Sequence, residues 1–224
     1  AEWKTRTWTT EAWREVAVYI IKNFPDYKLI TIGGGREKVK KMDNFIDMSG
    51  IEGLTEFYNK FSILETLAVM DSHRSKLLIT MDTAPLHMGA CCKELPILGI
   101  FTVVKSQFRM PVRNKQLGYK FWAIDSKDCS CTYDFANLVD TINLMGCKWQ
   151  DFYNRLLTSQ LTPEAITTAW NNVHNTHIEL VTKEMILEKV AEYKEYKCMP
   201  SVKEVTDKID YIMRQFHWIE SSSA

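Results

Sequence analysis

The chain has 224 residues, of which 46% are apolar and 25% are charged, and this composition excludes a fully disordered chain. Its 28 basic and 28 acidic residues cancel, so the chain lacks the basic field of a protein that coats nucleic acid or binds anionic membranes. No apolar run approaches the ~20 residues that span a bilayer, and the N-terminus shows no hydrophobic signal core. Reading the six scattered cysteines as reduced thiols, we expect a cytoplasmic protein with no membrane span and with no nucleic acid as a direct partner.

Helical and strand patterns alternate over about the first 125 residues. Apolar residues from Trp13 to Phe24 recur on one helix face, Thr9 or Thr10 can cap the start of this helix, and Pro25 ends it. Short apolar runs predict strands over residues 28–32, 45–48, 77–81, 96–101 and 120–124.

A second helix is predicted over residues 62–69, because Ser62 and Glu65 form a capping box at its start. We expect its buried face to consist of Leu64, Leu67, Ala68 and Val69. A third, small-residue helix is predicted over residues 85–92. Residues 49–61 and 103–118 lack clear periodicity, and we expect loops or insertions there.

The strand runs carry no polar alternation, which indicates strands that are buried on both faces by helices. The predicted fold is therefore α/β, a Rossmann-like doubly wound parallel sheet. After about residue 134 the pattern is helical to the end, with helix starts at Thr162 and at Ser201. We expect two parts, a Rossmann-like domain over residues 1–150 and an all-helical extension over residues 151–224.

The stretch from residue 79 to residue 90 carries the chemistry. A buried strand leads into the polar residues Asp82 and Thr83, and a helix begins at once, which places this turn at the carboxyl edge of the sheet. N–H groups of the first helical turn form an anion site, to which Thr83 adds a hydroxyl and His87 a side chain. The alternative, that Asp82 and Thr83 only cap a helix and that His87 is a satisfied polar residue, stays open at this point.

Residues 82–87 (D-T-A-P-L-H) resemble the D-T-G-P-x-H motif of glycosyltransferase family 9, which contains the heptosyltransferases of lipopolysaccharide synthesis and has the GT-B fold. Four further stretches resemble other motifs of that family's donor-binding half, in the same order. Residues 6–8 resemble its K/R-x-W-P opening, and residues 30–37 resemble its strand that ends in G-G-P-x-E. Residues 61–65 resemble its T-S-L-x-E helix start, and residues 93–101 resemble its G-K-P-V-V-x-L-F strand. Ala84 replaces the glycine of the motif, so a turn that needs a positive φ would be strained there.

The resemblance implies the C-terminal, donor-binding half of a GT-B enzyme of the hexosyl- or heptosyltransferase type. Such a domain binds a nucleotide-diphosphate sugar as its substrate and transfers the sugar to an unknown acceptor without a cofactor or a metal ion. The catalytic base is expected outside this chain, in an N-terminal acceptor half or a partner protein. The residues implied for donor and phosphate binding are Arg6, Gly34, Asp82, Thr83, Ala84, Pro85, Leu86 and His87. A plain tight turn explains the glycine run around Gly34 equally well.

Other interpretations remain beside this one. A non-catalytic module that kept the fold, for nucleotide binding or for assembly, is the alternative function. Cys129, Cys131 and Cys147 suggest zinc, but no fourth ligand lies nearby in the sequence, so buried thiols are expected instead. We expect His174 and His177 to lie on a solvated polar helix face.

Overall fold

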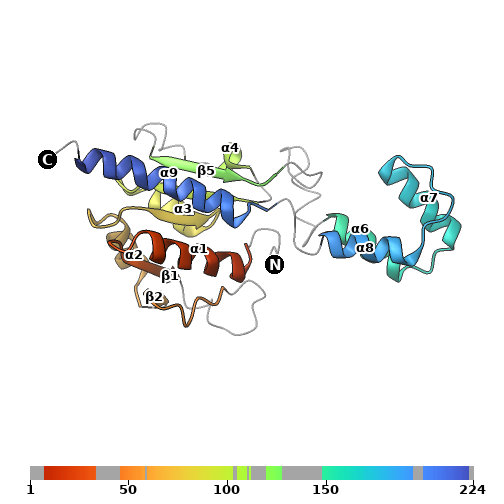
Figure 1. Cartoon of the computed structure of the whole chain (residues 1–224), viewed down its shortest axis with the longest axis horizontal. Coiled ribbons are helices and arrows are strands. Elements are labelled where there is room, and N and C mark those ends of the chain that lie inside the picture. The colour runs from red at the N-terminus through yellow and green to blue at the C-terminus, as the bar shows by residue number, and fades with distance from the viewer. Residues whose placement is uncertain are drawn as a thin grey trace.

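The computed structural model describes residues 8–33, 46–58, 60–102, 105–109, 111, 120–127, 148–193 and 199–221. Its α/β part contains α1 (Thr10–Asn23), β1 (Leu29–Gly33), β2 (Leu54–Tyr58), α2 (Ile63–Met70), β3 (Leu78–Met81), α3 (Ala84–Gly89), β4 (Ile97–Phe101), α4 (Ser106–Arg109) and β5 (Phe121–Asp125). The later helices are α6 (Lys148–Thr158), α7 (Pro163–His174), α8 (Lys183–Tyr193) and α9 (Val202–Ser221) (Figure 1).

All strand pairs in these residues are parallel, and this confirms the predicted α/β class. β1 pairs with β2, while β4 lies between β3 and β5. Ile97 lies opposite Leu78 on one side and Phe121 on the other, so the three strands run in register. Their carboxyl ends therefore meet at one edge of the sheet.

Helices cover both faces of the sheet, as a doubly wound fold requires. All residues of β4 are buried, and neighbouring residues point to opposite faces. Leu98 and Ile100 pack with α1 and α9, whereas Ile97 and Phe101 pack with Met70 of α2 and with α3. Figure 1 shows α1 and α9 side by side on their face of the sheet.

The predicted helix starts are confirmed where caps were expected. The Thr9 hydroxyl accepts the Ala12 N–H at the start of α1, and Phe24 lies at the C-terminal cap. The full capping box of Ser62 and Glu65 is present at α2. The capping bonds at the starts of α7 and α9 are also formed, by Thr162 and by Ser201 with Glu204.

Three local predictions are wrong. Residues 46–48 are not a strand, and the segment predicted as a loop contains β2 at residues 54–58. The adjacent polar residues Thr55 and Glu56, of which Glu56 is exposed, interrupt β2, so it lacks the continuous apolar run of a central strand. On α2, Leu64 is 77% exposed and Ala68 is also exposed, because that helix buries Met70 instead.

The C-terminal helices divide their contacts between two hydrophobic clusters. α6, α7 and α8 share one cluster, which includes Tyr153, Leu156, Trp170, Val181 and Ile186. α9 instead packs on α1 and the sheet through Val205, Ile209, Ile212 and Met213. The division at residues 150 and 151 stays a prediction. The last helix of the predicted extension nevertheless lies in the α/β core.

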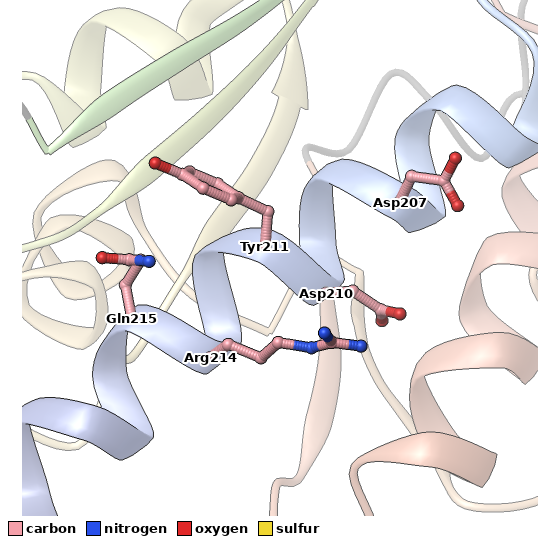
Figure 2. Close-up of a pocket in the computed structure, with 5 residues that line it drawn as sticks. All are labelled: Asp207, Asp210, Tyr211, Arg214 and Gln215. Carbon is pink, nitrogen blue, oxygen red and sulfur yellow. The ribbon is translucent and has the colours of Figure 1, made fainter.

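The exposed side of α9 carries a shallow groove of about 270 Å³. It is lined by Asp207, Asp210, Tyr211, Arg214 and Gln215, all from one helix (Figure 2). The Tyr19 hydroxyl of α1 donates a hydrogen bond of 2.8 Å to the Asp210 carboxylate, which raises the pKa of Tyr19. In the part of the chain that the structure describes, no helix is both long enough and apolar enough to cross a bilayer.

Candidate functional site

The carboxyl edge of β3, β4 and β5 is also where several helices begin. The Trp8 N–H, just before α1, donates to the Met81 sulfur at 3.2 Å, and the Trp8 indole N–H donates to the Pro200 carbonyl at 3.0 Å, just before α9. α3 follows β3 directly. The N-terminal ends of these helices carry partial positive charge, so the backbone makes this edge favourable for an anion.

Asp82 lies at this edge, directly after β3. The residue is 8% exposed, and its two carboxylate oxygens face two different nitrogen-bearing side chains. Oδ1 lies 3.8 Å from Nε2 of His87, and Oδ2 lies 3.7 Å from Nε of Arg109. Both distances exceed a hydrogen bond, so the two partners approach the carboxylate without being locked to it. The side chains of His87 and Arg109 stay 56% and 40% exposed, so they remain accessible to a ligand.

The turn after Asp82 uses some of the N–H groups that were expected to bind an anion. The Thr83 N–H donates to the Met81 carbonyl at 2.8 Å, and the Leu86 N–H donates to the Thr83 carbonyl at 3.0 Å. Pro85 has no N–H to offer. The Thr83 hydroxyl makes no capping bond to α3. It donates instead to the Met81 carbonyl, at 3.3 Å. Thr83 is thus the N-cap residue of α3 by its backbone position, but its side chain does not cap the helix.

The structure accommodates an alanine at position 84 and buries the leucine at position 86. Ala84 lies in the first turn of α3, and among the described non-glycine residues only Asn175 has a positive φ, so the expected strain at Ala84 does not arise. The Leu86 side chain is fully buried in the cluster between α3 and the sheet. Gly89 allows this close approach, because a Cβ there would lie 2.5 Å from a Leu78 methyl group.

Arg109 is the residue at this edge that sequence reasoning missed. It lies on α4, inside the segment predicted as a loop. Ser106 anchors α4 to the end of β5, since its N–H and hydroxyl donate to the Asp125 carboxylate at 2.6 and 2.7 Å. Lys105 adds a bond of 3.0 Å from Nζ to the Ser126 carbonyl. The sequence offered only the position of this segment as a signal for Arg109. The segment follows the buried parallel strand β4, so it emerges at the carboxyl edge of the sheet.

Some predicted residues lie outside the described part of the chain. These are Arg6, Gly34 and the three cysteines of the zinc interpretation, Cys129, Cys131 and Cys147. Among the residues that the structure does describe, no group of three or more His, Cys, Asp or Glu side chains is arranged to hold a metal ion. Arg6 and Gly34 stay predictions.

His174 does not lie on a solvated face, contrary to expectation. Its Nε2 is 2.9 Å from the Tyr153 hydroxyl, and its ring stacks on the Tyr153 ring with centroids 5.8 Å apart. Trp170 closes the other side, with a centroid distance of 4.5 Å. Burial, together with the charge of Lys189, lowers the pKa of His174. This histidine is thus half-buried against the aromatic residues of the α6–α8 cluster.

Comparison with known proteins finds similarity to a solved structure. No family model matches the sequence, and no curated protein matches it. The chain is similar to the crystal structure of a glycosyl transferase family 9 protein from Veillonella parvula DSM 2008, with a TM-score of 0.45 and 21% sequence identity. The similarity covers 62% of this chain and 36% of that chain.

Proposed function

We propose that this chain is the donor-binding domain of a glycosyltransferase and holds a nucleotide-diphosphate sugar at the carboxyl edge of β3 and β4. The observation that carries the proposal is the buried Asp82 carboxylate at this edge, with the accessible His87 imidazole beside it. The resemblance of residues 82–87 to the D-T-G-P-x-H motif supports the same assignment. An open parallel sheet supports it as well, because ligands of such folds bind outside the carboxyl ends of the strands.

The chemistry of transfer gives each of these side chains a role. As the bond between sugar and diphosphate breaks, negative charge develops on the leaving diphosphate, and donors aimed at that charge lower the barrier. His87 donates to the diphosphate, and the exposed Thr83 hydroxyl lies in the same turn. Asp82 orients the imidazole or accepts a hydroxyl of the sugar. The transfer in this proposal is metal-independent, and the base that activates the acceptor belongs to an acceptor half or partner protein.

The second candidate is a module that kept the fold without donor binding. One observation favours it, namely that the N–H groups of Thr83 and Leu86 are already bonded within their own turn. This leaves side chains, rather than a cradle of backbone amides, to hold the diphosphate. The two candidates differ in a simple way, because the second binds no nucleotide sugar at this edge.

Calorimetric titration separates the two candidates. The purified chain is titrated with UDP, ADP, GDP and CDP and with sugars linked to each of them. We expect one base to bind, and we expect His87→Ala to weaken that binding at least about tenfold through loss of a hydrogen bond to a charged group. His73→Ala is the matched control, since His73 is exposed in the turn that precedes β3, at the opposite edge. Absence of binding for every ligand overturns the donor-domain proposal, and equal binding by both variants overturns the site.

A further inference from the structure

Arg109 is held at the proposed site by contacts that leave its guanidinium available. α4 is fixed to the sheet by Ser106, which donates twice to Asp125, so the backbone that carries Arg109 is anchored. Across the described residues, the guanidinium forms no hydrogen bond, and its contact with Asp82 is an ion pair of 3.7 Å. Its side chain is 40% exposed. An arginine with an anchored backbone and an exposed guanidinium offers several N–H donors in a fixed planar arrangement to a ligand beside Asp82.

Arg109 and His87 act on the same small region. They face the two oxygens of one carboxylate, with His87 on Oδ1 and Arg109 on Oδ2 of Asp82. A guanidinium and an imidazole that flank a single carboxylate lie close enough together for one diphosphate group to contact both. Asp82 offsets the charge of Arg109, while the exposed side chains of Arg109 and His87 keep N–H donors that can bond the oxygens of a phosphate ligand.

We propose that Arg109 is a binding residue that selects the diphosphate group of the donor, by pairing the phosphate that His87 does not reach. This inference rests on the proposed function and adds a residue and a preference to it. A planar guanidinium binds phosphate oxygens in a bidentate manner, which a lysine ammonium cannot do. Losing this pair therefore costs more affinity for a diphosphate than for a monophosphate, which His87 alone can hold.

The test compares nucleoside monophosphate with nucleoside diphosphate on the same base. For the wild-type chain, we expect the diphosphate to bind at least tenfold more tightly, and inorganic pyrophosphate to compete with it. In Arg109→Gln, we expect the diphosphate affinity to fall at least tenfold while the monophosphate affinity changes less than threefold. In Arg109→Lys, we expect an intermediate value. Arg74→Gln is the control, because Arg74 is exposed at the other edge of the sheet.

Each outcome decides the proposal. Collapse of the preference for diphosphate in Arg109→Gln, with unchanged binding in Arg74→Gln, supports it. Equal diphosphate affinity in wild type and Arg109→Gln overturns it. If the diphosphate affinity of His87→Ala falls in the same series, the proposed function still stands. Absence of nucleotide binding by the wild-type chain overturns both. Circular dichroism spectra and melting temperatures of the variants separate loss of binding from loss of fold, and Arg109→Lys supplies a second reading with charge retained.

Discussion

The contact between α9 and the sheet depends on Ile209, whose side chain is 1% exposed in the cluster with α1 and β4. We predict that Ile209→Ala destabilises the α/β part substantially. The substitution removes three buried carbon atoms, worth about 0.8 kcal/mol each in transfer free energy. The cavity that remains adds to this, and measured losses for such truncations lie at about 2–5 kcal/mol. We therefore expect the free energy of unfolding to fall by roughly 3–4 kcal/mol.

Urea denaturation, followed by circular dichroism, measures this loss. The midpoint should fall while the dependence of the unfolding free energy on urea stays constant, since the surface that unfolds is unchanged. Leu187→Ala on α8 is the matched control, because Leu187 is 47% exposed and its truncation should cost no more than about 0.5 kcal/mol. A loss below about 1 kcal/mol for Ile209→Ala would refute the packing of α9 into this core.

Three further predictions follow from the same structure. Burial and Lys189 lower the pKa of His174, so this imidazole takes up a proton more readily in the unfolded chain than in the folded one, and the free energy of unfolding should fall as pH drops below about 6.5. Urea titrations of wild type and His174→Gln at pH 7.5 and pH 5 measure this effect. An identical pH dependence of the two proteins would contradict it. Burial raises the pKa of Cys92 to about 11, so peptide mapping after iodoacetamide treatment at pH 7.5 should find the exposed Cys91 alkylated and Cys92 protected in the folded protein, whereas equal labelling would count against the packing. A chain that ends at residue 150 lacks α9 and should show no cooperative urea transition, whereas cooperative unfolding of that fragment would show that the α/β part is complete without α9.

Sequence patterns predicted the α/β class well because its signals are local. The continuous apolar run of β4 predicts burial on both faces, and side-chain caps such as Ser62 mark helix starts directly. β2 escaped prediction for a physical reason. Glu56 interrupts its pattern, and its strand conformation comes from pairing with β1, a partner that local periodicity does not identify.

The candidate site was predictable only in part. The turn with Asp82 and His87 follows from a buried strand that leads into a helix, so sequence reasoning places both residues at the carboxyl edge. The proximity of Arg109 to Asp82 is a tertiary fact, because it depends on the attachment of α4 to Asp125, far along the chain. For the same reason, the half-buried position of His174 was missed, because Tyr153 and Trp170 contact it from two different helices.

The central claim is that the carboxyl edge around Asp82 holds the diphosphate of a nucleotide-linked sugar. A crystal structure of the chain with the tightest-binding nucleoside diphosphate tests this most directly. The account predicts diphosphate oxygens within about 3.2 Å of the His87 imidazole and the Arg109 guanidinium. A nucleotide bound elsewhere, such as in the groove on α9, with both side chains still facing only Asp82, would contradict it.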